Sequence, residues 1–310
     1  MILTNIFLLL LCLFILTKSA DYAVKYSTRI ARLFKMPEFL ISFVLVAMIS
    51  VFPEATVSII SAIKHAPEFG AAVLIGSNVA DLAVVTGIAA LASRKGIKVK
   101  SGILKKSFFC LALLFLPVLL GLDGSYSRID GAVLVTAAAL FFISLTLHKH
   151  LKNAFFKPHN HLWKSIRILA LSLAVLLASA HYTIKLSTLL SNEIGIPRMI
   201  IGLTVVALGT CLPETIFSLR SVRKHHNTLA LGDILGTVVT DATLILGIVA
   251  LISPFSFDKT LCYVTGISMF LAGVILAAFM ETGKLLTKKE GIMLIAFYLI
   301  TIIVELAIKL

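Results

Sequence analysis

The amino-acid sequence predicts an all-α membrane protein of ten transmembrane helices, arranged as two inverted-topology repeats of five helices each. Three observations support this prediction: the hydropathy, the spacing of the apolar runs, and an internal repeat of 160 residues. Of the 310 residues, 59% are hydrophobic and 14% are charged, and the mean hydropathy is +1.04. A soluble domain this apolar lacks the polar residues to cover its surface, whereas a membrane protein needs charge only in its loops.

Ten apolar runs are long enough to cross a bilayer as helices, which takes about 20 residues each. The first and sixth runs are longer than the bilayer requires, so we expect them to be tilted or to extend beyond it. The runs lie near residues 5–33, 37–64, 68–93, 103–121, 128–148, 162–192, 196–223, 227–252, 261–280 and 290–309.

Basic residues favour one side of this arrangement. If the N-terminus lies outside, the inward-facing loops hold 20 of the 28 lysine and arginine residues and the outward-facing positions hold five. The positive-inside rule therefore predicts that both termini are extracellular, and we expect the cell membrane of a prokaryote. The net charge of +13 follows from this topology. No basic stripe is interleaved with aromatic residues, so the charge does not indicate a nucleic-acid partner.

Shifting the sequence along itself by 160 residues aligns residues 5–93 with residues 165–253 without a gap, and 29 of these 89 positions are identical. Each half has five spans, an odd number, so the second half enters the membrane with the opposite orientation. In transporters, such inverted repeats place the substrate site near the membrane midplane, where broken helices of the two halves meet.

The repeat also divides the chain. We expect a first five-helix repeat at 1–148, in which the first copy of the site-bearing region lies at about 39–93. A second repeat is expected at 162–310, with its corresponding region at about 199–253. Residues 149–161 form the predicted cytoplasmic linker between them.

Four carboxylates recur at matched positions inside the predicted spans. Glu54 and Glu214 each follow a proline, and Asp81 and Asp241 come 27 residues after them. Ionisable residues within a membrane are costly and are functional candidates by default. Two symmetry-related pairs are difficult to explain as kinks stabilised by a neighbouring span, so we interpret them as one site shared by the two halves.

The prolines that precede the glutamates, Pro53 and Pro213, predict breaks in their helices. Proline lacks a backbone N–H and clashes with the carbonyl four residues earlier. We expect the helices to open around 47–50 and 207–210, where freed carbonyls, those of Ala47 and Ala207 among them, would be available to bind a cation.

Hydroxyl groups lie four residues before each of the four carboxylates, a spacing that places hydroxyl and carboxylate on one helical face. Glycines at positions 76 and 236 stand beside two of these hydroxyls, as a close approach between helices requires. The hydroxyl residues are Ser50, Thr210, Ser77 and Thr237.

The site so predicted holds carboxylates, hydroxyls and carbonyls, with no Lys or Arg at the same depth, so only cations can neutralise it. Calcium takes six to eight hard oxygen ligands, whereas magnesium keeps water and transition metals prefer His or Cys. Calcium is the best match and sodium a natural competitor. Two other acidic residues, Asp21 and Asp233, have His181 and Val73 at the matched positions, and for both we expect interfacial or structural roles.

At these residues the sequence resembles the cation/calcium exchanger superfamily. Its sodium/calcium exchanger members carry two inverted repeats, each with a Gly-Thr-Ser-Leu-Pro-Glu motif followed by a Gly-Ser-Asn motif. The second half reads Gly-Thr-Cys-Leu-Pro-Glu at 209–214 and Gly-Thr-Val-Val-Thr-Asp at 236–241. The first half matches less closely, with Ile-Ser-Val-Phe-Pro-Glu at 49–54 and Gly-Ser-Asn-Val-Ala-Asp at 76–81.

The resemblance implies a transporter, not an enzyme, that works by alternating access, with the first and sixth spans sliding against a fixed core of eight helices. Carried over by position, the calcium ligands are Glu54 and Glu214, and Ser50 and Thr210 supply hydroxyls. The transported ions would be Ca2+ with Na+ or H+, and no resident cofactor is implied. The expected partners are inorganic cations and the lipid bilayer, with no nucleic acid and no protein partner.

Three of the departures from the family motifs bear on which ions the site binds. Val51 and Cys211 replace the serine of the first motif, so a hard oxygen ligand for sodium is lost in each half. Asp81 stands where sodium/calcium exchangers commonly have asparagine. The sequence therefore favours calcium/sodium exchange and keeps proton-coupled exchange of calcium or another divalent cation as the alternative, because carboxylates held close together favour a shared proton when no metal is bound.

Two other classes of membrane protein share part of this pattern. An intramembrane aspartyl protease also uses two Asp residues on neighbouring spans that share a proton. The residues flanking Asp81 and Asp241 do not resemble that family, and the Pro-Glu pairs would have no role in it, so it is a distant alternative. A channel would use the same ion ligands, but its transport would not depend on a counter-ion gradient.

Overall fold

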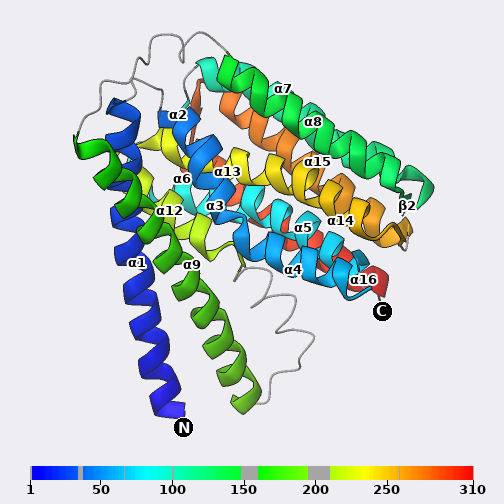
Figure 1. Ribbon diagram of the computed structural model, residues 1–310, viewed down its shortest axis with the longest axis horizontal. Coiled ribbons are helices and arrows are strands. Elements are labelled where there is room, and N and C mark those ends of the chain that lie inside the picture. Colours follow the sequence, from blue (N-terminus) through cyan, green and yellow to red (C-terminus); the bar gives the residue numbers. More distant parts are fainter. Residues whose placement is uncertain are drawn as a thin grey trace.

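The computed structural model shows a bundle of helices in which α1 (Ile2–Leu33) and α9 (Asn160–Ile194) lie side by side and extend beyond the rest (Figure 1). These two helices are the first and sixth predicted spans. The structure describes residues 2–33, 38–65, 67–99, 101–147, 160–194, 210–257 and 259–309.

The remaining helices of the first half follow in chain order. Two spans are interrupted by π-helical segments at Ser42–Val46 and Asp81–Val85, and a 3-10 turn at Gly121–Asp123 ends the fourth. The helices are α2 (Glu38–Ile41), α3 (Ala47–Ser50), α4 (Phe52–Ile63), α5 (Pro67–Ala80), α6 (Thr86–Ala92), α7 (Ser101–Leu120) and α8 (Arg128–Leu147).

In the second half a π-helical segment at Thr240–Ile245 again interrupts the third span of its repeat. Four two-residue strands connect helix ends: β1 (Ile97–Lys98), β2 (Ser125–Tyr126), β3 (Phe255–Ser256) and β4 (Leu285–Leu286). The helices after α9 are α12 (Leu212–Arg223), α13 (Asn227–Val239), α14 (Leu246–Ile252), α15 (Lys259–Glu281) and α16 (Lys288–Lys309).

Every one of the ten predicted spans contains helix within the described residues, although the part of the seventh span before residue 210 lies outside them. By length and composition alone, five helical stretches of the described residues are able to cross a membrane, and six if the bent pair Glu38–Ser50 and Phe52–Ile63 counts as one span. The predicted all-α membrane fold is confirmed.

Helices of the first half pack directly against helices of the second half. α6 of the first half packs against α16 of the second, and α14 packs against α8. Each contact is made at a pair of glycines: a Cβ on Gly87 would lie 2.7 Å from the Gly291 carbonyl, and one on Gly247 would lie 2.9 Å from the Gly131 carbonyl. Each glycine has its counterpart 160 residues away, so the repeat in the sequence is also a symmetry of the packing.

The connections at the helix ends repeat in the same way. β1 pairs with β4 and β2 with β3, so each two-stranded sheet joins the two halves. α8 and α16 begin with matching capping boxes, in which the Ser127 N–H donates to Asp130 at 2.8 Å and the Thr287 N–H donates to Glu290 at 2.6 Å. A capping box satisfies backbone donors that the first helical turn leaves unpaired.

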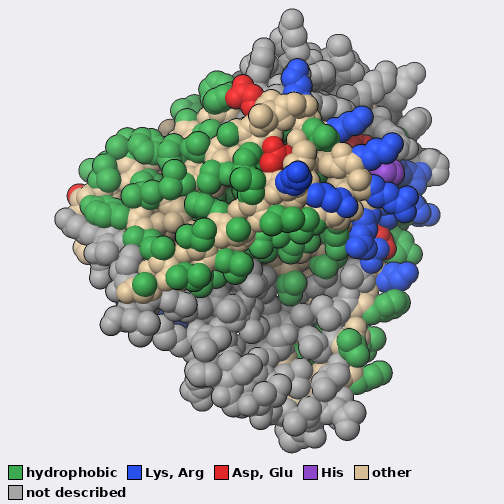
Figure 2. All heavy atoms as spheres, turned by 180° about the vertical axis from the view of Figure 1, so that it is seen from behind, with side chains coloured by type: hydrophobic (Ala, Val, Ile, Leu, Met, Phe, Trp, Pro, Cys, Tyr) green, Lys and Arg blue, Asp and Glu red, His purple; other side chains and the backbone are tan. Residues whose placement is uncertain are grey.

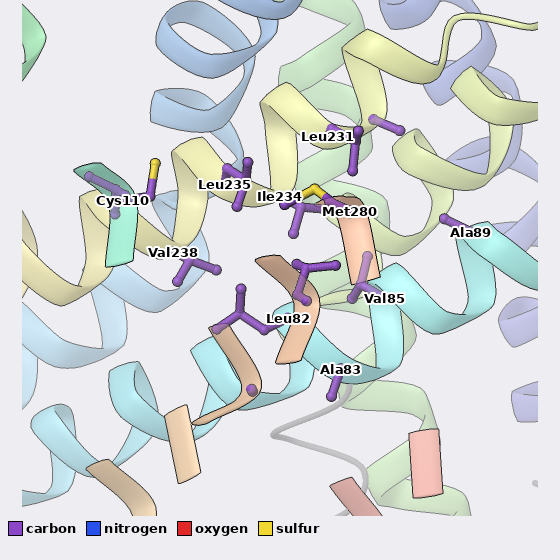
Figure 3. Close-up of a cluster of buried hydrophobic side chains, with 14 of the residues drawn as sticks. Leu82, Ala83, Val85, Ala89, Cys110, Leu231, Ile234, Leu235, Val238 and Met280 are labelled. Atoms are coloured by element: carbon purple, nitrogen blue, oxygen red, sulfur yellow. The ribbon is translucent and has the colours of Figure 1, made fainter. Parts of the chain in front are cut away.

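α13 forms the centre of the bundle and is buried from Thr228 to Val239. A helix that is apolar on all sides is stable only inside a core. Figure 3 shows Ile234 and Val238 of this helix beside Leu82 of the first half, and Leu82 and Val85 belong to the same buried cluster. The polar residues that α13 carries are therefore held deep in the protein.

On the face shown in Figure 2, hydrophobic side chains cover much of the described surface, and many Lys and Arg side chains gather along one edge. Two cavities that share His225 are lined by Lys98 and Lys284 and by Arg94 and Arg223 respectively. All four basic residues belong to predicted inward-facing loops or their borders. Their proximity agrees with one basic side of the bundle, as expected of a membrane protein.

Candidate cation site

The second span is broken immediately before Glu54. α3 ends at Ser50, α4 begins at Phe52 with Pro53 in its second position, and the two segments are bent by 45°. In the second half, α12 likewise begins at Leu212 with Pro213 in its second position. The observed break lies at Pro53, where the sequence predicts one, and the two glutamates lie in the first turns of matched helices.

One expectation about this break is wrong. The Ala47 carbonyl is not freed, because it accepts the Val51 N–H at 3.1 Å and the Ser50 hydroxyl at 3.3 Å. The physical reason is the position of the proline: Pro53 removes the N–H that would bond to Ile49, four residues earlier, and leaves the partner of Ala47 in place. Ala207, the matched residue, lies outside the described residues.

The four predicted carboxylates are buried in one region. Glu54, Asp81, Glu214 and Asp241 are at most 1% exposed. Glu54 and Asp81 interact electrostatically with each other, and both interact with Glu214 and with Asp241. The structure thus brings together the residues that the repeat predicted.

This cluster has no buried cationic side chain among the described residues, where every buried polar or charged side chain is Ser, Thr, Asn, Asp or Glu. Within those residues no oxygen of the four carboxylates accepts a hydrogen bond of ordinary geometry, although the Thr210 hydroxyl approaches Glu54 and the Cys211 thiol approaches Asp81. Burying a carboxylate without a partner is costly. The cluster therefore requires bound cations or protons.

The predicted hydroxyl residues are also buried. The Ser77 hydroxyl donates to the Leu74 carbonyl at 3.0 Å, and the hydroxyls of Ser50 and Thr237 lie 3.2 Å apart. The Cys211 thiol donates to the Ser77 carbonyl at 3.7 Å. The last two of these contacts join residues of the two repeats, so the motifs of the two halves lie side by side.

Asp233 belongs to this cluster, although the sequence predicts an interfacial or structural role for it. Its side chain is 0% exposed. Its Oδ1 accepts the Ser50 hydroxyl at 3.3 Å, and it interacts electrostatically with Asp81 and Glu214. A signal was present in the sequence: residues 233, 237 and 241 are spaced by four and share a helical face.

Asp21 lies apart from the cluster. Its carboxylate is 2.9 Å from the Lys224 ammonium and 3.8 Å from the Arg220 guanidinium, and about a quarter of its side chain is exposed. These ion pairs tie α1 to the end of α12, in keeping with the structural role expected for Asp21.

Close helix approach is visible at Gly236. A Cβ there would lie 2.5 Å from the Phe43 carbonyl and 2.6 Å from the Ala47 Cβ. Glycine at position 236 therefore allows α13 to lie against the second span, as predicted. For Gly76, the matched partner segment at 203–207 lies outside the described residues.

Carboxylates alone do not complete a metal site in the described part of the chain, where no three His, Cys, Asp or Glu side chains are grouped closely enough to hold one ion. Calcium and sodium both accept hydroxyl and carbonyl oxygens, so a mixed set of ligands fits their chemistry. Glu54 and Glu214 can contribute charge to such a set, and Ser50 and Thr210 can contribute neutral oxygens.

Comparison with known proteins identifies relatives over nearly the whole chain. The family described as sodium/calcium exchanger protein matches residues 4–147 and again residues 164–307. The sodium/calcium exchanger MaX1 of Methanosarcina acetivorans is 28% identical over 351 aligned residues, which cover 98% of this chain and 99% of the relative. The inner membrane protein YrbG of Escherichia coli K12 is 28% identical over 291 residues, covering 87% and 86% respectively.

A solved structure gives the same answer for the fold. The sodium-calcium exchanger NCX_Mj, in crystals soaked with Na+ and Sr2+, superposes with a TM-score of 0.87 at 25% identity, and the match covers 97% of this chain and 99% of that one. The family matches twice, once in each half of the molecule. This agrees with the repeated motifs and with the packing of helices of one half against helices of the other. This chain belongs to the sodium/calcium exchanger family.

Proposed function

We propose that this protein is a secondary-active antiporter that exchanges Ca2+ for Na+ across the membrane by alternating access. The observation that carries the proposal is the buried carboxylate cluster at the Pro-Glu breaks, which has no buried basic side chain near it among the described residues. Two of its relatives, MaX1 and NCX_Mj, are named as sodium/calcium exchangers. Inverted repeats with broken helices provide the two related states that alternating access needs.

Calcium is best accommodated between the two halves. We assign Glu54 and Glu214 as its charged ligands because they occupy matched positions at the two helix breaks and interact with each other. Ser50 and Thr210, at the last turn before each break, supply hydroxyl oxygens. No aspartyl-protease chemistry uses the two glutamates, and the relatives give that alternative no support.

Proton coupling is the second candidate, and the composition of the cluster favours it. The Val51 side chain packs in an apolar cluster, and the Cys211 thiol donates to a backbone carbonyl, so neither offers a hard oxygen to sodium. With Asp233 the cluster holds five carboxylates, three more than one Ca2+ neutralises. Protons can balance the remainder when sodium does not.

The expected organisation of the chain remains part of the proposal. The first repeat would comprise residues 1–148 and the second 162–310, with 149–161 as a cytoplasmic linker. Both termini would be extracellular, in a prokaryotic cell membrane. The basic edge formed by predicted inward-facing residues supports this orientation.

The decisive experiment is uptake of labelled Ca2+ into proteoliposomes, under an outward Na+ gradient in one arm and a pH gradient in the other. We expect uptake with the Na+ gradient and little with the pH gradient. Uptake that needs only the pH gradient identifies proton coupling. Uptake without either gradient identifies a channel, and uptake under no condition contradicts a calcium transporter.

Restoring a hydroxyl at position 51 is expected to strengthen the response to sodium. One added ligand of hydrogen-bond strength is worth about 1 kcal/mol, or about a fivefold lower half-saturating Na+ concentration for Val51→Ser. The measurement is Na+-dependent Ca2+ release from loaded proteoliposomes, with Val51→Ala as the control for lost side-chain volume. An unchanged Na+ response would show that residue 51 is not positioned to bind the ion.

A further inference from the structure

Charged groups hold α1 against the end of α12. The Lys224 ammonium lies 2.9 Å from the Asp21 carboxylate and also donates to the Asp21 backbone carbonyl at 3.4 Å. The Arg220 guanidinium lies 3.8 Å from the same carboxylate. One carboxylate on the first span therefore faces two basic groups on a helix that carries a site glutamate.

The repeat does not reproduce this charge pattern. The counterparts 160 residues away are His181 for Asp21, Ile60 for Arg220 and Lys64 for Lys224. None of these three counterparts carries a negative charge, so no ion pair can form among them. The α1–α12 contact can therefore be stabilised by charge, whereas the same positions of the matched α9–α4 contact cannot.

The packing of the two matched contacts is also unequal. Among the described residues, α1 packs extensively against α12, whereas α9 and α4 touch only slightly, and the later part of α9 stands apart from α4 in Figure 1. Phe217 of α12 is 1% exposed in a cluster with Val24 of α1, while its counterpart Val57 on α4 is only partly buried. Ser221 on α12 is fully buried, and its counterpart Ser61 is partly exposed. The end of the molecule at which α12 finishes is thus covered, and the matched end at α4 is less covered.

We propose that Asp21, Arg220 and Lys224 form a latch that holds the α12 end of the exchanger closed in one of its two states only. The inference rests on the proposed alternating access, in which α1 and α9 slide and the two matched contacts interchange their arrangements. When α1 leaves α12 the ion pairs break, and the α9–α4 contact that forms instead gains none at the matched positions. The latch therefore favours the state that is open at the α4 end, the predicted extracellular side.

The exposure of these side chains determines how strong the latch is. The Asp21 side chain is 26% exposed, that of Arg220 30% and that of Lys224 42%, so water and salt screen the ion pairs. Partly exposed pairs of this kind change an equilibrium by up to about fivefold. Such a latch biases the two states without locking the protein in either of them, as repeated transport cycles require.

The test compares the exposure of the two matched contacts, using the rate at which a maleimide modifies an added cysteine in purified protein in detergent. Val24→Cys reports on the α12 end and Val57→Cys on the α4 end, and each variant without the added cysteine corrects for the four native cysteines. In Asp21→Asn we expect modification to become about two- to fivefold faster in Val24→Cys and to become slower in Val57→Cys. Opposite changes at the two ends identify a change of state, because local loosening of α1 accelerates the first reaction without slowing the second.

Further variants separate the latch from other effects of charge. Lys224→Gln should change both rates in the same directions as Asp21→Asn, and it takes the place of Asp21→Asn if that variant does not fold. Combining the two substitutions should add nothing to Asp21→Asn alone, because both remove the same interaction. Lys64→Gln is the matched control, and both rates should equal those of the wild type. Raising the choline chloride concentration should accelerate modification of Val24→Cys when Asp21 is present, since salt screens the ion pairs, and not in Asp21→Asn.

His181→Asp supplies the carboxylate that the second half lacks. It can pair with Lys64 when α9 approaches α4, so it should also accelerate modification of Val24→Cys, and adding Lys64→Gln should cancel this effect. Unchanged rates in Asp21→Asn and Lys224→Gln, or faster modification at both ends, would overturn the latch. Failure of the exchange function itself shows separately, as an absence of Ca2+ uptake by wild-type proteoliposomes.

Discussion

Replacing either Glu54 or Glu214 with glutamine is expected to reduce Ca2+ exchange by more than a hundredfold. Each glutamate is buried, lies in the first turn after a helix break and interacts with the other. The partner that each glutamate loses is the Ca2+ ion: removing one member of a buried pair of opposite charges typically costs about 3–5 kcal/mol, and about 2.8 kcal/mol already corresponds to a factor of one hundred. Glutamine keeps the size of the side chain, so the loss reports charge.

The measurement is the initial rate of labelled Ca2+ uptake, normalised to the amount of folded protein in the liposomes. Glu68→Gln is a matched control, because Glu68 is an exposed glutamate in the first turn of α5. Its exchange rate should equal that of the wild type. A wild-type rate in Glu54→Gln or Glu214→Gln would remove that residue from the proposed calcium site.

The fold was predictable because the repeat constrains it strongly. Proline, glutamate and aspartate recurred at one spacing, and apolar composition alone does not align such residues. The contact between α6 and α16 at Gly87 and Gly291 was not predictable, because contacts between spans of opposite halves leave no periodic signal in the sequence. Helix packing depends on close three-dimensional approach, which a shift of the sequence along itself does not measure.

The candidate site was predictable to the same extent. Symmetry identified the four matched carboxylates, and the structure brings them together. The same symmetry concealed Asp233, because a residue whose counterpart is Val73 has no repeated signal. The error at Ala47 has a different origin: the effect of proline was assigned to a whole turn, whereas it acts on the carbonyl four residues earlier.

The asymmetry between the halves bears on coupling. A perfectly symmetric site would offer equal ligands to both halves, and its two open states would bind ions equally. Here Asp233 adds a carboxylate to one half only, and Val51 and Cys211 differ in polarity at matched positions. Ion preference can therefore differ between the two open states, which a coupled exchanger is able to use.

Substituting alanine for Gly236 is expected to cause the largest loss of stability. The new Cβ would lie 2.5 Å from the Phe43 carbonyl and 2.6 Å from the Ala47 Cβ, so α13 and the second span would have to separate. Overpacking of this kind costs roughly 1–3 kcal/mol. The measurement is thermal unfolding in detergent, with Gly266→Ala as the control, because its nearest contact is an ordinary 3.5 Å from Val118.

The same substitution tests whether packing positions the ion ligands. Ala47 lies one turn before Ser50, whose hydroxyl contacts both Asp233 and Thr237 across the same interface. Moving α13 outward lengthens these contacts. Na+-dependent Ca2+ release from loaded proteoliposomes should therefore slow in Gly236→Ala protein that remains folded, while Gly266→Ala keeps the wild-type rate. An unchanged rate of release in folded Gly236→Ala protein would show that ion binding does not depend on the close approach of these helices.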